Sequence, residues 1–250
     1  MRIVDALYKK WGNSMVSASK LKLLSAGAVK GGVAQLTAEF ERKTGTSVAI
    51  DYAPAPDLRS RVAAGEAADA VIIPQSMLDE LATQGKIIDD SRGLIGRSRM
   101  GIAVHANAPA NTIANAEDFK RLALGASAVV YNTASSGVYT AKLLEKLGLT
   151  QTLALKIVVV NSGAAIMEYV AGHPPGAVGL AQISEIMVLI AKGCAVRLAA
   201  PLPDEIQNST TYYAAVLTGS TGAAQQAARA LVQHLTAATA KSAFAATGID

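Results

Sequence analysis

Short apolar segments alternate with amphipathic ones along almost the whole chain, and this alternation constrains the fold more than any other feature of the sequence. Most of the apolar segments are apolar at successive positions, as expected of parallel strands that are buried on both faces. We predict strands at residues 21–26, 47–53, 70–73, 101–105, 128–132, 157–161, 177–182, 196–199 and 212–219. Sheets built in this way carry helices on both faces, so the sequence predicts an α/β fold.

The amphipathic segments between these strands have recognisable ends. Several are followed by a glycine, which commonly terminates helices, and a Ser-x-x-Asp capping pattern opens at Ser76. We predict helices at residues 31–43, 76–84, 137–147, 162–171 and 223–241.

Two strands are candidates for crossovers between domains. "RSRMGIAVHANAP" follows a long approach that contains glycine and arginine, and "STTYYAAVLTGS" follows the proline-rich "AAPLPDEIQ". We therefore predict two doubly wound lobes joined by two crossover strands, with a ligand cleft between the lobes. The first lobe would comprise residues 20–100 and 215–250, the second residues 101–214, and residues 1–20 would form an N-terminal extension.

Composition excludes several classes of protein. The chain has 250 residues, of which 51% are hydrophobic and 17% charged, which is enough to bury a large core. Its net charge of +4 lies mostly in residues 1–20, and only 4% of residues are aromatic, so a nucleic-acid partner is not expected. No uncharged apolar run is long enough to predict a membrane span. The single cysteine, Cys194, excludes an internal disulfide and is interpreted as a small buried hydrophobe.

The first twenty residues, "MRIVDALYKKWGNSMVSASK", do not read as a signal peptide. Asp5, Lys9 and Lys10 interrupt every candidate apolar core. We expect either a cytoplasmic protein or a periplasmic one whose leader has been removed or replaced. Apolar residues at positions 3, 4, 7 and 8 could form a short amphipathic turn that packs on the body or on a partner.

Four loops between a strand and a helix carry candidate ligand-binding residues. In "VVYNTASSGVYTAKLLEKLGL", Thr133, Ser135 and Ser136 lie at a helix start, where unpaired backbone N–H groups and the helix dipole favour an anion. The alternative is that one serine is only the N-cap. In "SAGAVKGGVAQL", Lys30 adds a cation to the backbone donors of the two following glycines, unless the loop is merely a tight turn with a solvated lysine.

The other two loops are "DYAPAPDLRSRV" and "VVNSGAAIMEYVAG". Arg59 and Arg61 present planar guanidinium groups suited to a carboxylate, although we expect at most one of them to point inward. Asn161 and Ser162 precede the fourth helix. Together the four loops predict a site that holds an anion mainly through neutral donors.

The chain resembles the periplasmic molybdate-binding protein family. The resemblance covers roughly residues 21–250; "AAGEAADAVIIPQ" is its most specific part, and "GVYTAKLLEKLGL", "AVGLAQISEI" and "YYAAVLTGS" add to it. It implies a type II periplasmic-binding-protein fold, a ligand between two α/β lobes, and delivery of that ligand to the permease of an ABC transporter.

The sequence departs from that family at its oxyanion site. Ala28 and Val29 replace paired serines, Pro54, Ala55 and Pro56 replace the serines of the second loop, and Ala181 or Gln182 replaces a tyrosine. Losing hydroxyl donors leaves a buried oxyanion unpaired, so we predict a small organic carboxylate as ligand. The predicted ligand-binding residues are Ala28, Val29, Lys30, Pro54, Ala55, Arg59, Thr133, Ser135, Ser136, Asn161, Ser162 and Gln182.

Enzymes such as aconitate isomerases also resemble this family, so the sequence leaves open whether the ligand is only bound or also converted. Isomerisation by proton transfer needs a general base. His105, His173 and His234 are poor candidates by position, and the best of them is His105, at the end of a predicted crossover strand. Glu168 and Asp57 are expected to be solvated. No nucleophile motif or metal-ligand spacing occurs, so neither a metal nor a cofactor is predicted. A solute-binding protein, a tricarboxylate isomerase and a regulatory sensor domain remain the alternatives.

Overall fold

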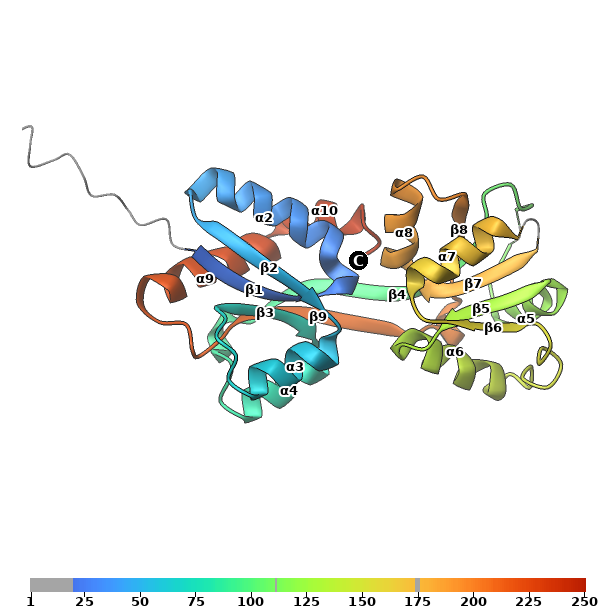
Figure 1. The fold of residues 1–250 in the computed structure, drawn as a ribbon, viewed down its shortest axis with the longest axis horizontal. Helices are drawn as coiled ribbons and strands as arrows, with labels where there is room; N and C mark the ends of the chain where they lie inside the picture. Colours follow the sequence, from blue (N-terminus) through green and yellow to red (C-terminus); the bar gives the residue numbers. More distant parts are fainter. Residues whose placement is uncertain (1–19, 111, 174–175) are drawn as a thin grey trace, which may run out of the picture.

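A computed structural model describes residues 20–110, 112–173 and 176–250 of the chain (Figure 1). The predicted turn at positions 3 to 8 lies outside these residues. The strands in the described part are β1 (Lys20–Ala26), β2 (Ser47–Ala53), β3 (Ala70–Pro74), β4 (Gly93–His105), β5 (Ala128–Asn132), β6 (Ile157–Val160), β7 (Ala177–Gln182), β8 (Val196–Pro201) and β9 (Ser209–Val216).

These strands form two sheets that share β4. The order is β2-β1-β3-β9-β4 in the first sheet and β4-β7-β5-β6 in the second, where β8 also pairs with β4. Strands β1, β2 and β3 are parallel to one another, as are β5, β6 and β7, whereas β4 and β9 run antiparallel to their neighbours. Figure 1 shows the two sheets as two lobes side by side. The predicted α/β fold with two doubly wound lobes is therefore confirmed.

The connection between the lobes consists of β4 and the chain entering β9. The first half of β4 pairs with β9 in the first sheet, and its second half pairs with β7 and β8 in the second sheet. Among the described residues, strand β9 pairs within the first sheet, with β3 and β4. Residues 209–214, which the sequence analysis assigned to the second lobe, thus contribute their backbone hydrogen bonds to the first sheet.

Helices cover both faces of each sheet. They are α2 (Lys30–Thr44), α3 (Ala55–Ala63), α4 (Gln75–Thr83), α5 (Ala116–Gly125), α6 (Ser135–Lys146), α7 (Gly163–Gly172), α8 (Ile183–Ala191), α9 (Gly222–Thr236) and α10 (Lys241–Ala245). Short 3-10 turns occur at η1 (Gly27–Val29), η2 (Asp89–Ser91), η3 (Asp204–Ile206) and η4 (Ala238–Ala240).

Four hydrophobic clusters fill the layers between sheets and helices. In the first lobe, α2, α9 and α10 pack on one face of the sheet and α3 and α4 on the other. In the second lobe, α5 and α6 pack on one face, and α7 and α8 on the other. Burial of these apolar side chains stabilises both lobes, and it fixes where each helix begins relative to the strand before it.

Several element predictions were wrong in detail, among them the strand at residues 212–219, which is observed at Ser209–Val216. The predicted helix at residues 223–241 ends at Thr236, because Ala237 is extended and the chain turns there to bring buried Phe244 against Gly32 of α2. Ser76 is not an N-cap, because α4 begins one residue earlier, directly after Pro74, and its start has no side-chain cap. Strand β4 begins eight residues before the predicted strand, in a segment whose glycines and arginines are unusual for a strand.

Candidate functional site

The candidate site is built from the carboxyl ends of the parallel strands in both lobes. In the first lobe, β1, β2 and β3 lead into η1 and α2, α3, and α4; in the second, β5, β6 and β7 lead into α6, α7 and α8. Figure 1 shows α2, α6, α7 and α8 beginning on the facing sides of the two lobes. The starts of α2, α3, α6 and α8 have no side-chain cap. In α2, however, the N–H of Lys30 donates to the Gly27 carbonyl of η1, and the second residue of α3, Pro56, has no N–H.

The loop after β1 presents one cation and little other polarity. Lys30 is exposed, and its Nζ lies 5.0 Å from the ring centroid of Tyr52 at the end of β2. The Tyr52 hydroxyl donates a hydrogen bond of 3.5 Å to the Lys30 carbonyl, and burial raises its pKa to about 12, so it stays protonated. Ala28 is half-buried, whereas the side chain of Val29 is fully buried in the core. Only the backbone of Val29 could therefore contact a ligand, contrary to a role for its side chain.

The two glycines after Lys30 have a packing role that the sequence analysis did not anticipate. A Cβ on Gly31 would lie 2.6 Å from Thr247, and one on Gly32 would lie 2.3 Å from the Phe244 ring. Both positions are close approaches between α2 and the segment around α10. This packing explains why glycine is needed there, whether or not a ligand contacts the backbone.

The loop after β2 contributes apolar atoms, while its two arginines are occupied elsewhere. Pro54 is exposed and Ala55 is half-buried at the start of α3. The Arg59 guanidinium lies 2.8 Å from a carboxylate oxygen of Glu80 on α4. This ion pair holds the predicted ligand-binding group within the first lobe.

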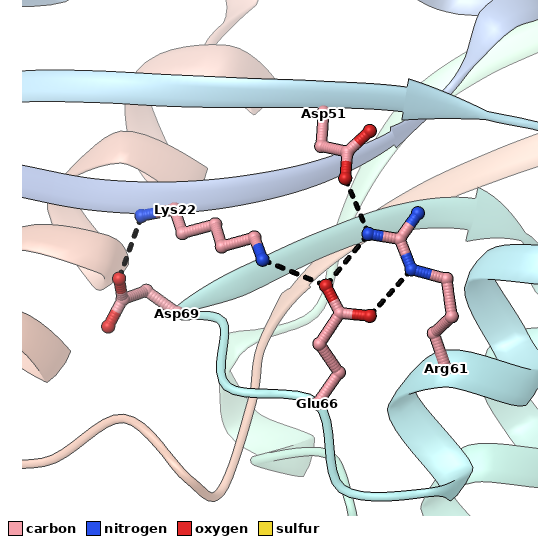
Figure 2. Close-up of polar contacts among 5 residues, drawn as sticks. All are labelled: Lys22, Asp51, Arg61, Glu66 and Asp69. Carbon is pink, nitrogen blue, oxygen red and sulfur yellow. Dashed lines mark hydrogen bonds and ion pairs between the residues drawn. The ribbon is translucent and has the colours of Figure 1, made fainter.

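Arg61 belongs to an ionic cluster that Figure 2 shows at the edge of the first sheet. It contacts Glu66 at 2.6 Å and Asp51 at 2.5 Å, and Glu66 also accepts a hydrogen bond of 2.8 Å from Lys22. Hydrogen bonds from Arg61 and then Lys22 lower the pKa of Glu66 to about 2. Asp69 accepts from the Lys22 backbone N–H and from the hydroxyl of Ser220. Both acids of "GEAAD" therefore hold the first lobe together.

The loop after β5 has one buried hydroxyl group, which stabilises the loop, and two exposed ones. Ser136 is buried and donates to the side-chain oxygen of Asn132, which also accepts from the backbone N–H of Ala134. Thr133 and Ser135 are exposed. A Cβ on Gly137 would lie only 1.5 Å from the Asn132 carbonyl oxygen, so α6 starts in direct contact with the end of β5. Of the predicted residues here, Thr133 and Ser135 have accessible side chains, and Ser136 holds the loop in shape.

The loop after β6 is capped by one of its predicted ligand residues. The hydroxyl of Ser162 accepts a hydrogen bond of 3.1 Å from the backbone N–H of Ala165, so this serine is the N-cap of α7. Asn161 is exposed beside it. The N-cap alternative, raised for the serines of the β5 loop, thus applies to this loop instead.

The junction of β7 and α8 contains the predicted residue Gln182 and also Glu185, which the sequence analysis missed. Buried Ser98 on β4 donates to the side-chain oxygen of Gln182 at 2.7 Å and lies 3.5 Å from the Ser184 hydroxyl. Next to them, the Oε2 atom of Glu185 is buried and has no hydrogen-bond partner among the described residues. Burial raises the pKa of Glu185, although a backbone hydrogen bond at Gln182 opposes the shift. An acid in the first turn of a helix is ordinary in sequence, so only its burial distinguishes Glu185.

The histidines and the cysteine lie apart from these loops. His105 is buried at the far end of β4, where its Nδ1 accepts from the backbone N–H of Asn107. His173 stacks on Tyr169 with ring centroids 4.0 Å apart, and His234 contacts the Leu36 carbonyl. Cys194 is half-buried against the core of the second lobe. None of the three histidines therefore lies at these loops, where a general base would have to be.

Two surface cavities lie beside α5 and α10. One of about 580 Å³ lies beside α5 and includes the paired side chains of Asp118 and Arg121. The other, of about 610 Å³, lies between the first half of β4 and α10. In the described ranges of the chain, no group of His, Cys, Asp and Glu side chains is arranged to hold a metal ion. Nor does any helix of the described residues have the length and apolarity to cross a membrane.

Comparison with known proteins identifies the family. The family model described as "Bacterial extracellular solute-binding protein" matches residues 21–250. The chain belongs to this family. A curated relative of this solute-binding protein, the aconitate isomerase of Pseudomonas sp., is 30% identical over 237 residues, which span 92% of this chain and 87% of the relative.

Solved structures show the same fold. The periplasmic molybdate-binding protein of Azotobacter vinelandii matches with a TM-score of 0.69 at 19% identity, covering 92% of this chain and 98% of that one. The sulfate-binding protein of Mycobacterium tuberculosis matches with a TM-score of 0.67 at 17% identity, covering 92% and 86%. The type II periplasmic-binding-protein fold of the molybdate-binding kind, predicted from the resemblance, is thus confirmed.

Proposed function

We propose that this solute-binding protein holds a small organic anion with carboxylate groups between its two lobes. The observation that carries the proposal is the contrast between the facing loops. The second lobe offers the exposed hydroxyls of Thr133 and Ser135, whereas the first lobe offers Ala28, Pro54 and Ala55 beside the exposed cation of Lys30. A bare tetrahedral oxyanion needs donors on every side, but an organic acid has carbon atoms that suit an apolar wall.

Uncapped helix starts in both lobes support an anionic ligand. The first N–H groups of α6 and α8 can donate to carboxylate oxygens, and the dipoles of α2, α3, α6 and α8 favour negative charge at these helix starts. In this role the protein would deliver its ligand to the permease of an ABC transporter. Its residues Asn161, Ser162 and Gln182 would then border the ligand, with Ser162 and Gln182 acting mainly through the loops that they hold.

A second function is favoured by the relationship to the Pseudomonas aconitate isomerase. Identity of 30% along 92% of the chain is higher than the identity to the molybdate- and sulfate-binding structures named above. We propose isomerisation of a small unsaturated tricarboxylate as the alternative to binding alone. Both functions require the same carboxylate site, and they differ in whether a proton is removed from the bound ligand.

A ligand panel tests the binding proposal. We would measure thermal unfolding with molybdate, tungstate, sulfate and phosphate, and with di- and tricarboxylates, because a ligand that binds only the folded state raises the melting temperature. A shift with carboxylates and none with molybdate is expected. A shift with molybdate alone would contradict the proposal.

Single substitutions then locate the site. We expect Ser135→Ala and Lys30→Ala to weaken carboxylate binding in calorimetry without lowering stability, since both side chains are exposed. Lys43→Ala is the matched control, because Lys43 is exposed on the last turn of the same helix as Lys30. Unchanged affinity in both site variants would mean that the ligand binds elsewhere.

A further inference from the structure

Glu185 is a half-buried residue with one buried carboxylate oxygen, and the proposed binding function does not use it. It is the third residue of α8, and its Oε2 atom is buried without a hydrogen-bond partner among the residues that the structure describes. An unpaired buried carboxylate oxygen is costly, and the cost is greater when the group is charged. A residue kept in such an environment needs a reason beyond helix capping, since capping uses one oxygen and could be served by an uncharged Gln.

The surroundings of this carboxyl group come from both lobes. A Cβ on Gly163, the first residue of α7, would lie 2.6 Å from Glu185 Oε2, so α7 begins directly against the carboxyl. From the first sheet, Tyr212 lies near enough that burial and the charge of Glu185 raise its pKa to about 12. Helix α8 also packs against η1 of the first lobe. Glu185 is therefore positioned where the lobes meet, beside the loops proposed to bind the ligand.

This environment is the one that a proton-transferring carboxyl group needs. Burial raises the pKa of Glu185 above its ordinary value, which makes its carboxylate a stronger base. The nearby phenol of Tyr212 stays protonated and does not compete as a base. The starts of α7 and α8 partly offset the negative charge when the carboxyl is ionised.

We propose that Glu185 is the group that moves a proton on a bound unsaturated tricarboxylic acid, which rests on the carboxylate site proposed above. The Glu185 carboxylate takes a proton from the methylene carbon between a carboxylate and the double bond. The electron pair left on that carbon delocalises across the double bond, which shifts by one position. The proton then returns from Glu185 to the far carbon of the three-carbon unit. The carboxylate is regenerated, and no oxidant, reductant or further reactant is consumed.

The test separates binding from proton transfer. In deuterated buffer, proton NMR of trans-aconitate follows both isomerisation and the loss of methylene protons by exchange. Calorimetry with propane-1,2,3-tricarboxylate, a saturated analogue that has no double bond to shift, measures binding alone. Wild type is compared with Glu185→Gln, which keeps the shape of the side chain, and with the control Glu168→Gln, whose side chain is exposed on α7.

We expect wild type to exchange and isomerise the ligand, and Glu185→Gln to lose about 100-fold or more in rate. Its affinity for the saturated analogue should stay within about threefold, and Glu168→Gln should match wild type. If Glu185→Gln fails to fold by circular dichroism, Glu185→Asp decides, since the shorter carboxylate should bind the analogue but react at least about tenfold more slowly.

Two results would overturn the inference. One is a wild-type rate in Glu185→Gln, or in Glu185→Asp where only that variant folds. The other is a wild-type protein that binds tricarboxylates yet neither isomerises nor exchanges them; the binding function would then stand and Glu185 would be only a buried cap. If wild type binds no carboxylate at all, the proposed function itself fails, which is a distinguishable outcome.

Discussion

Replacing Gly137 by alanine should distort the start of α6, and the structure fixes the size of the effect. The new Cβ would lie 1.5 Å from the carbonyl oxygen of Asn132, whereas real Cβ atoms essentially never come within 3.0 Å of another atom. The helix start and the strand end must therefore separate by about 1.5 Å. That movement strains the hydrogen bonds from Ser136 and from the backbone of Ala134 to the Asn132 side chain.

The change in the free energy of unfolding caused by Gly137→Ala follows from three contributions. Two weakened hydrogen bonds cost about 1 kcal/mol each, and overpacking costs about 1 to 3 kcal/mol. The helix propensity of alanine returns about 1 kcal/mol. The net loss of about 2 to 4 kcal/mol lowers the melting temperature by roughly 4 to 16 °C in a chain of this size.

The assay is thermal unfolding followed by circular dichroism without ligand, with Gly125→Ala as the control. Gly125 is the last residue of α5, and a Cβ there would meet no atom within 4 Å. That substitution should raise stability by about 0.4 to 1 kcal/mol through the unfolded state. A Gly137→Ala protein that melts at or above the wild-type temperature would refute the contact between α6 and the end of β5.

Three further predictions concern stability. Arg61 and Lys22 lower the pKa of Glu66 to about 2, so the ionised Glu66 stabilises the fold above its ordinary pKa of 4.5, and this stabilisation is lost as the pH falls toward 2. Glu66→Gln should therefore melt below wild type at pH 7, and the difference in melting temperature should disappear in acid. A difference in melting temperature that does not change with pH would contradict this. Ser98→Ala leaves the buried Gln182 oxygen without its donor and should cost about 1 to 3 kcal/mol in urea unfolding, whereas an unchanged midpoint would show that the bond contributes nothing. Phe244→Ala opens a cavity against Gly32 and should cost about 3 to 5 kcal/mol by the same measurement; a loss below 1 kcal/mol would argue that α10 does not pack there.

The sequence predicted the architecture because its signals are local. Alternating apolar and amphipathic segments fix strands and helices, and the order in which they alternate favours parallel strands with helices on both faces. The boundaries that failed lie where tertiary contacts override local preference. Helix α9 ends at Thr236 because Phe244 has to reach Gly32, and β4 extends through Gly93 and Gly96 because β9 pairs with it.

The candidate site was predicted less completely, since the side-chain partners that folding brings together decide which groups stay accessible. Arg59 suits a carboxylate ligand, yet the structure gives it the carboxylate of Glu80, 21 residues away. Arg61 meets Glu66 and Asp51 in the same way. Local sequence cannot separate an arginine that binds a ligand from one that binds its own chain. The remaining predicted ligand contacts, such as Lys30 and Ser135, stay predictions.

Glu185 shows the converse difficulty, because its unusual property is invisible in the sequence. In "AQISEI" it is an acid in the first turn of a helix, a position where acids are common and solvated. What sets it apart is Gly163, 22 positions earlier, whose missing side chain lets the carboxyl lie against α7, together with Tyr212 from the other sheet. The absence of a hydroxyl group from a site can be recognised in the sequence, but the burial of a carboxyl group can be recognised only in the fold. For this reason the histidines attracted attention as bases, whereas the group best placed to move a proton is a glutamate at the junction of the lobes.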